Sequence, residues 1–368
     1  MIQELTALAG SDVLPFHMPG HKRRSDGSWI EEIYRYDITE IDGFDNLQKP
    51  EGLIADIEKG FAEYYGADKA HLLVNGSTCG ILSAISAAVP HRELLLMDRG
   101  AHQSAFNAAF LGELRTAYIN RAAISGYEIS ACISPEEVRG MLKSAEERND
   151  LPRAVFLTSP TYEGFIADIE GIADLVHDHD IPLIVDGAHG AHLNVSKRAD
   201  ITVVSLHKTL PALTQLSVLL VNGDLVDEAE IKRYINIFQT SSPSYILMAS
   251  AEKCLGYLKE KSGSAKESLD KELDRVYTLK SRLRKIDIIG PEYIGKNGIY
   301  GYDRSKINLV DRSGKADGQQ IYDTLRIKSG IQPEMAMGAD CLLMTSVMDT
   351  HESFERLMDA IEAADREI

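Results

Sequence analysis

Seven short runs of aliphatic and β-branched residues alternate with segments long enough for helices, and this alternation constrains the fold more than any other feature. Helical candidates between the runs include Pro135–Glu147 and Asp168–His179. The pattern predicts an α/β fold with a mostly parallel, seven-stranded sheet covered by helices on both faces. Ligands in such folds bind beyond the carboxyl ends of the strands. The predicted strands are His71–Val74, Leu94–Met97, Ala117–Ile119, Ala154–Leu157, Leu183–Val185, Ile201–Val204 and Val218–Val221.

The chain divides into three parts. Residues 1–50 are rich in Pro, Gly, His and charge without a sustained period, which predicts an N-terminal arm. Apolar residues then recur at helical spacing from Leu53 to Tyr64, with Gly66 at the expected helix end. The strands and helices of residues 51–250 predict a large domain, and the mixed pattern of residues 251–368 predicts a small C-terminal α+β domain.

Charge and composition exclude some classes of protein. The formal net charge of −17 argues against a nucleic-acid surface and suits a cationic substrate. Apolar runs such as Ala84–Val89 are too short to span a bilayer, and no export signal is visible, so we expect a cytoplasmic protein without membrane contact. The four cysteines have no CxxC or zinc-like spacing, which predicts reduced thiols and no metal site.

Polar residues follow the predicted strands at four places. In VNGSTCG (residues 74–80), Gly76 allows a tight turn, and Ser77, Thr78 and the first N–H groups of a helix form an anion pocket. A simple helix cap is the alternative. His102 follows another strand and opens a helix. It is placed either to stack on a flat aromatic ring or to serve as a satisfied polar group.

The other two strand ends carry an acid and an amine. Asp186 ends an apolar strand among small residues, where a carboxylate is costly without a partner. Ser205, His207 and Lys208 lie between two β-rich runs. Lys208 follows Asp186 by 22 residues. Burial makes the charged form of a lysine amine unfavourable, and conversion of the amine to an imine removes this cost. An exposed lysine on a β-bulge is the alternative.

Together the four strand ends match the chemical needs of pyridoxal 5′-phosphate (PLP). Its phosphate needs hydrogen-bond donors, its ring nitrogen an acidic partner, and its aldehyde an amine. Ser77 with Thr78, Asp186 and Lys208 supply these groups in that order, and His102 is available to stack on the ring. The sequence therefore predicts a PLP enzyme in which Lys208 forms the Schiff base.

Several segments resemble the Orn/Lys/Arg decarboxylase family of fold-type-I PLP enzymes, most of all its compact arginine- or lysine-decarboxylase branch. The resemblance runs from about residue 13 to 350, so it covers nearly the whole chain. The segments are PFHMPGHKRR (15–24), DITEIDGFDNLQKPEG (37–52), VNGSTCGILSAI (74–85), DRGAHQSAF (98–106), SPTYEGFIADI (159–169), DGAHGAHL (186–193), SLHKTLPALTQ (205–215), QTSSPSYILMAS (239–250) and GIQPEM (330–335).

This resemblance implies roles at matching positions. Lys208 matches the Schiff-base lysine, Asp186 the acid on the pyridine nitrogen, and His102 the histidine stacked on the ring. Ala188 matches the residue on the opposite face of the ring, and His189 lies near the reacting carbons. The phosphate is held by Ser77 and Thr78, with Ser205 and His207 as neighbours.

Two further roles concern the subunit partner and the substrate. The resemblance implies a homodimer with shared active sites, in which Ser242 reaches the phosphate of the neighbouring subunit. Glu334 matches a partner for the distal cationic group of the substrate, although a solvated loop glutamate is an equal alternative. The implied reaction is decarboxylation of arginine, lysine or ornithine to the amine and carbon dioxide.

The fold alone does not select that reaction. An aminotransferase would need an arginine for a second carboxylate, and Arg304, Arg312 and Arg326 are available, although surface ion pairs are the expected use of each. A catalytically inert subunit that keeps the fold is a rival from another class. It has no need of Lys208, Asp186 and His102 together.

Overall fold

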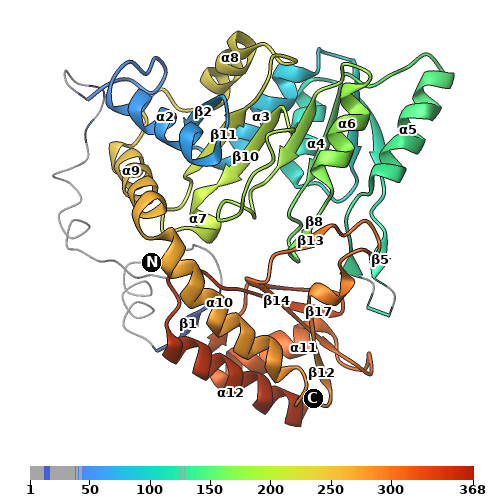
Figure 1. The fold of residues 1–368 in the computed structure, drawn as a ribbon, viewed down its shortest axis with the longest axis vertical. Helices are drawn as coiled ribbons and strands as arrows, with labels where there is room; N and C mark the ends of the chain where they lie inside the picture. The colour runs from blue at the N-terminus through green and yellow to red at the C-terminus, as the bar shows by residue number, and fades with distance from the viewer. Residues whose placement is uncertain (1–11, 17–37, 39, 41–43, 125, 128) are drawn as a thin grey trace.

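A seven-stranded sheet forms the centre of the larger of two units (Figure 1). The computed structural model describes residues 12–16, 38, 40, 44–124, 126, 127 and 129–368. Every pairing in the sheet is parallel except those of β11, which runs antiparallel to both neighbours. All seven predicted strands are present, and the α/β fold class is confirmed. In sheet order they are β2 (Lys69–Leu73), β11 (Ser217–Val221), β10 (Ile201–Ser205), β9 (Leu183–Asp186), β7 (Ala154–Thr158), β3 (Leu94–Asp98) and β4 (Arg115–Ile119).

Helices cover both faces of this sheet because successive strand residues point to opposite sides. Val203 packs in a cluster with α3, α4 and α8, whereas Val204 packs in a cluster with α2 and α9. A third cluster joins α5 and α6 to β7 and β9. The helices are α2 (Leu53–Tyr65), α3 (Gly76–Ala88), α4 (Gln103–Leu111), α5 (Pro135–Glu147), α6 (Ile169–His177), α8 (Glu228–Phe238) and α9 (Tyr245–Glu260), with a short hairpin of β5 (Ala123–Ile124) and β6 (Ile129–Ser130) beside them.

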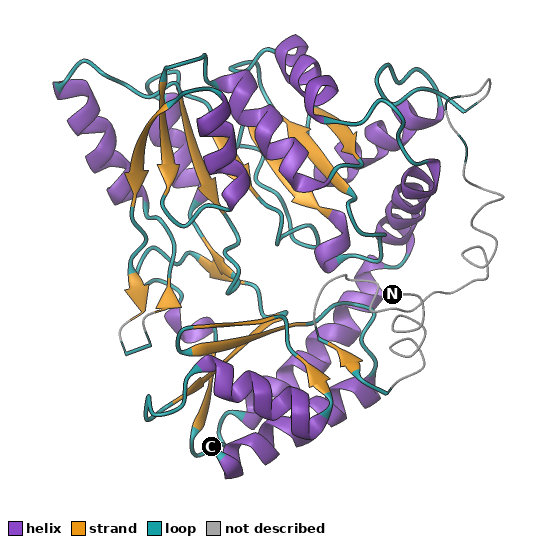
Figure 2. Ribbon diagram, turned by 180° about the vertical axis from the view of Figure 1, so that it is seen from behind, coloured by secondary structure: helices purple, strands orange, loops and turns teal. Residues whose placement is uncertain are grey.

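The smaller unit is a four-stranded antiparallel sheet with helices packed against it. Its core contains residues from the sheet, from α10 and from α12. The arrows of several parallel strands in the large sheet point toward this unit (Figure 2). Its elements are α10 (Ser262–Leu279), β12 (Ile286–Ile289), η2 (Pro291–Tyr293), β14 (Lys306–Asp311), α11 (Gly318–Asp323), η3 (Thr324–Lys328), β16 (Met335–Met337), β17 (Asp340–Met344) and α12 (His351–Glu367).

Two short pairings complete the packing of the chain. β13 (Gly301–Tyr302) pairs with β8 (Phe165–Ile166) and joins the smaller unit to the larger one. β1 (Leu14–Pro15) pairs with β15 (Ile331–Gln332). The expected domain boundary at residue 251 falls inside α9, whose buried residues Ala251 and Cys254 pack in the same cluster as α2. Most of the predicted arm over residues 1–50 lies outside the described residues.

All four cysteines are buried and free of disulfides. Within the part of the chain that the structure describes, no helix combines the length and apolar character that a membrane span requires.

Gly80 lets α3 lie close to the sheet. A Cβ atom at this position would come within 2.8 Å of Leu73 Cδ1 and of Val203 Cγ1. The first turn of α3 carries Ser77 and Thr78, so this close contact also fixes where the predicted anion pocket lies relative to the strand ends. Gly140 of α5 is different, since a Cβ atom there would meet no atom within 4 Å.

We therefore expect opposite effects from two glycine-to-alanine changes. Gly80→Ala should lower the free energy of unfolding by about 1–3 kcal/mol, because the added methyl group overpacks the interface of helix and sheet. Gly140→Ala should raise it by about 0.5–1 kcal/mol, because alanine loses less backbone entropy in a helix. Urea denaturation midpoints measure both. Equal midpoints for the two variants would contradict the close packing of α3.

Candidate active site

Asp186 and Lys208 lie at the same edge of the large sheet. Asp186 is the last residue of β9, which pairs in parallel with β10, so that Val203 and Asp186 are register partners. β10 ends at Ser205, and Lys208 follows in the single helical turn α7 (Leu206–Thr209). The carboxyl ends of the two strands thus bring together the acid and the amine that the sequence predicts. A helical turn, rather than a β-bulge, carries the lysine.

The Lys208 amine has an unusual environment for a lysine. Its Nζ atom lies 3.0 Å from His189 Nε2 and 5.4 Å from the centroid of the Tyr162 ring. Burial lowers the pKa of Lys208, the carboxylates of Asp186 and Glu334 raise it, and Lys306 lowers it, with a net shift below the ordinary lysine value. A larger share of the amine is therefore neutral, and thus nucleophilic, near neutral pH.

Asp186 is a buried carboxyl group with spare hydrogen-bonding capacity. Its side chain is 3% exposed, and Oδ1 accepts a hydrogen bond of 3.1 Å from the backbone N–H of Ala188. Burial raises the pKa of Asp186, and the nearby charge of Lys208 lowers it, with a net upward shift. Among the described residues Asp186 forms no ion pair. A ring N–H donor would satisfy this carboxylate through a charge-assisted hydrogen bond.

His189 lies between Tyr162 and Lys208. It is 2% exposed, its ring centroid is 4.0 Å from that of Tyr162, and the two rings are tilted by 52°. Burial, with the charges of Lys208 and Lys306, lowers the pKa of His189 well below its ordinary value, so the imidazole is neutral. Its Nδ1 atom is buried without a hydrogen-bond partner among the described residues. Such an orphaned atom calls for a ligand or a water molecule.

His102 is the N-cap of α4. Its Nδ1 atom accepts a hydrogen bond of 3.2 Å from the Ser104 N–H and contacts Ser104 Oγ at 2.8 Å. The ring is solvent-exposed. Its pKa is lowered by partial desolvation, while the Asp186 carboxylate raises it. These contacts make His102 a hydrogen-bonded N-cap residue, and its stacking on a cofactor ring stays a prediction.

Ser77 and Thr78 lie in the first turn of α3, as predicted. The N-cap residue Asn75 makes no side-chain cap hydrogen bond, and Gly76 adopts a φ of 76°. A helix of this length presents N–H groups to an anion at its N-terminus. Ser77 and Thr78 belong to the turn that carries these N–H groups.

Ser205 and His207 contact each other, and His207 also contacts Leu216, the residue before β11. Ser205 is fully buried, and its Oγ lies 3.2 Å from His207 Nδ1, which also lies 3.2 Å from the Leu216 carbonyl oxygen. These contacts fix the backbone that leads into Lys208. Ala188 is buried in the loop after Asp186.

Ser242 is exposed in the loop between α8 and α9. This loop lies against the N-terminus of α3, because the Thr240 N–H donates to Asn75 Oδ1 at 3.4 Å and the Val74 N–H donates to Gln239 Oε1 at 2.9 Å. The expectation that Ser242 reaches a neighbouring subunit stays a prediction.

Glu334 lies between β15 and β16 and is partly buried. Its backbone N–H donates to the Leu342 carbonyl at 2.9 Å. The charge of its carboxylate raises the pKa of both Lys208 and Tyr162. The small unit thus contributes an acidic group to a site that is built mainly on the large sheet.

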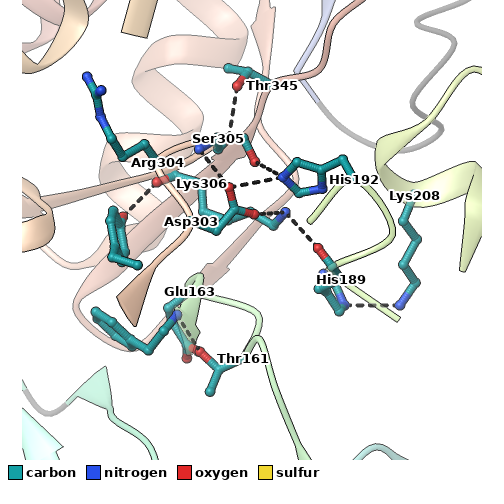
Figure 3. Close-up of polar contacts among 12 residues, drawn as sticks. Thr161, Glu163, His189, His192, Lys208, Asp303, Arg304, Ser305, Lys306 and Thr345 are labelled. Carbon is teal, nitrogen blue, oxygen red and sulfur yellow. Dashed lines mark hydrogen bonds and ion pairs between the residues drawn. The ribbon is translucent and has the colours of Figure 1, made fainter. Parts of the chain in front are cut away.

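Sequence reasoning missed three residues of this region. Tyr162 packs on the His189 ring. Asp303 and Lys306 form a buried ion pair beside the loop that carries His189 (Figure 3). The SPTYEGF segment contained the first of these, but no periodicity singles out its tyrosine. Lys306 opens an apolar strand, where a lysine ordinarily points to solvent, so nothing local marks it as buried.

A seven-stranded sheet of this topology, with a lysine and an aspartate at adjacent strand ends, has the fold shared by the class of fold-type-I PLP-dependent enzymes. Within that class, the family model described as "Orn/Lys/Arg decarboxylase, major domain" matches residues 1–327. The chain belongs to the Orn/Lys/Arg decarboxylase family.

Known proteins resemble the chain over most of its length. An arginine decarboxylase of Bacillus cereus is 26% identical over 367 residues, which cover 95% of this chain and 78% of that protein. O-phospho-L-seryl-tRNA:Cys-tRNA synthase 2 of Archaeoglobus fulgidus is 26% identical over 333 residues, 83% of this chain and 81% of that protein. A solved lysine decarboxylase of Francisella novicida superimposes with a TM-score of 0.79 at 18% identity, over 99% of this chain and 59% of that one.

The chain therefore spans less than two thirds of the length of that solved lysine decarboxylase. These findings confirm the predicted family, the predicted fold class and the PLP cofactor.

The environment of Lys208 predicts a distinct reactivity. In full-length protein freed of PLP, Lys208 should react with an acylating reagent at a lower pH than Lys143, which is exposed on α5, because burial favours the neutral amine. Mass spectrometry of peptides from protein labelled across a pH series measures both profiles. Coincident profiles would contradict the lowered pKa.

Proposed function

We propose that this chain catalyses the PLP-dependent decarboxylation of a basic amino acid (arginine, lysine or ornithine) to the corresponding amine and carbon dioxide. The observation that carries the proposal is the Lys208 amine, which lies 3.0 Å from His189 and within the electrostatic reach of Asp186 and Glu334. Membership of the decarboxylase family supports the same reaction.

The described residues fit PLP. Ser77 and Thr78, with the N–H groups of α3, would hold the phosphate, beside Ser205 and His207. The spare acceptor of Asp186 would take the ring N–H, and His102 and Ala188 would flank the ring. The unpartnered Nδ1 atom of buried His189 is a further group that a bound ligand would satisfy. When bound, PLP supplies an electron sink for the bond that breaks.

Lys208 and His189 would carry the proton transfers. The lowered pKa of Lys208 makes its amine available as a nucleophile, and release of the amine by the incoming substrate leaves it free to act as an acid or base. His189 Nε2 is within hydrogen-bond distance of that amine, so a proton can pass between them. Either group could return a proton to the substrate Cα after carbon dioxide leaves.

Glu334 would select a substrate with a distal positive charge. Glu334 belongs to the small unit, and its carboxylate acts on Lys208 through its charge. A guanidinium or ammonium group placed beside this carboxylate would gain a charge-assisted hydrogen bond. The net charge of −17 would add long-range attraction for a cation.

The three arginines considered for an aminotransferase are engaged elsewhere. Arg304 pairs with Asp274, Arg312 with Asp287 and Arg326 with Asp323. An aminotransferase would have to release one of them to bind a second carboxylate. This favours decarboxylation. Because the chain also resembles the tRNA-dependent synthase, the assay described next also looks for products other than the amine.

The proposal predicts amine formation that depends on Lys208. With PLP present, the parent protein should convert at least one of arginine, lysine and ornithine to its amine, and Lys208→Ala should lose this activity by several orders of magnitude. Lys143→Ala is the control, since this exposed residue lies on α5. Mass spectrometry of the products separates amine from keto acid. Keto-acid formation, or undiminished turnover by Lys208→Ala, would overturn the proposal.

Substrate selection by Glu334 predicts an effect on KM. Glu334→Gln should raise KM for the basic amino acid roughly tenfold to a hundredfold, because a hydrogen bond to a charged group contributes about 1.5–3 kcal/mol. Glu267→Gln, an exposed change on α10, should leave KM unchanged. Steady-state kinetics decides the matter, and an unchanged KM in Glu334→Gln would assign the distal cation to another group.

A further inference from the structure

Lys306 is a second lysine at the candidate active site, and it is fully buried. Its side chain is 0% exposed, although it opens strand β14 of the small unit. Its Nζ atom donates to Asp303 Oδ2 at 3.1 Å and to the backbone carbonyl oxygen of His189 at 3.4 Å (Figure 3). The ammonium group therefore contacts the backbone of the histidine that contacts Lys208.

Asp303 extends this contact along the loop. Its Oδ1 atom lies 3.1 Å from His192 Nε2, and Ser305 Oγ lies 3.3 Å from the same nitrogen. Although burial would raise the pKa of Asp303, the charges of His192 and Lys306 hold it well below its ordinary value, so the group is a carboxylate. Lys306 therefore contacts the first residue of the loop 189–192, and Asp303 contacts the last.

The turn before β14 is fastened to the loop that carries Tyr162. The Asp303 N–H donates to the Gly164 carbonyl at 2.8 Å, and Asn308 Nδ2 donates to the Glu163 carbonyl at 2.7 Å. Tyr162 in turn packs on the His189 ring. Both supports of His189, its backbone and its ring, therefore depend on the start of β14.

Stability alone gives a weak reason for such a pair. Burying two charges costs several kcal/mol per ion, and well-packed apolar replacements are often as stable or more stable. The pair contacts the loop that follows Asp186, and its ammonium group acts on Lys208 and His189 in the same direction, lowering the pKa of each.

We propose that Lys306 is a positioning residue of the active site: held by Asp303, its ammonium group fixes His189 against Lys208 and places a second positive charge beside the reacting amine. The inference rests on the proposed PLP site. The charged groups that act on Lys208 are Asp186 from β9, Glu334 from the β15–β16 turn and Lys306 from β14. The titratable rings near its amine are those of His189, Tyr162 and His102. Of the charged groups, Lys306 alone opposes protonation of the amine through its charge.

The informative variant removes both charges while keeping the shape. Lys306→Met alone leaves the Asp303 carboxylate buried without its lysine partner, and this variant is expected to fold poorly. The double variant Lys306→Met/Asp303→Asn avoids the uncompensated charge and keeps an oxygen acceptor for His192. Its urea midpoint should stay near that of the parent.

The test is a pH titration of the visible absorbance of the PLP-loaded full chain, combined with steady-state kinetics. In the double variant the titration midpoint should move to higher pH, because, of the two charges removed, it is Lys306, not Asp303, that acts on the Lys208 amine and opposes its protonation. A shift of about half a unit to one unit changes the protonation ratio roughly three- to tenfold at a fixed pH. The kcat value should fall while KM changes little, because substrate contacts are untouched.

Arg304→Met/Asp274→Asn is the matched control. It also removes one positive and one negative charge: Arg304, which lies in the same turn as Asp303, and Asp274 of α10, which pair at an N–O distance of 2.6 Å. Its absorbance midpoint should equal that of the parent. A folded Lys306→Met/Asp303→Asn variant with the parent's midpoint and kcat would overturn the inference. A parent protein that binds PLP but forms no amine would contradict the proposed function, and the absorbance titration would still decide the role of Lys306.

Discussion

The Lys208 amine is held where much of its hydration is lost, and the structure around it compensates with fixed charges. Asp186 and Glu334 favour the protonated amine, whereas burial and Lys306 favour the neutral one. The balance leaves the pKa below the ordinary lysine value, with His189 Nε2 at 3.0 Å as a proton partner. A parallel sheet brings Asp186 and Lys208 together, because the adjacent strands β9 and β10 end at the same edge.

The two units of the fold meet at this amine. The large sheet contributes Asp186, Lys208 and the first turn of α3, and the small unit contributes Glu334 and the ion pair of Asp303 and Lys306. The β8–β13 pairing and the backbone contact between Asp303 and Gly164 hold the units together beside the site. The charge environment of Lys208 is therefore a property of both units, and a change in the smaller one alters the chemistry of the larger.

Local sequence signals predicted the sheet and its strand ends because these follow from short-range physics. Periodicity located α2 at Leu53–Tyr65, and the apolar runs located all seven strands. Tyr162 and Lys306 escaped prediction because their roles depend on contacts between segments far apart in the chain: Lys306 contacts His189, 117 residues away. Apolar neighbours made Lys306 look like the exposed end of a strand.

The central claim is that one particular lysine among several reacts with the cofactor, and covalent trapping tests it most directly. PLP-loaded full-length protein is reduced with borohydride, digested, and searched by mass spectrometry for the peptide that carries the pyridoxyl mass. The structure predicts the label on Lys208 and an unmodified Lys306. A label on Lys306, on a surface lysine, or on no residue would contradict the account.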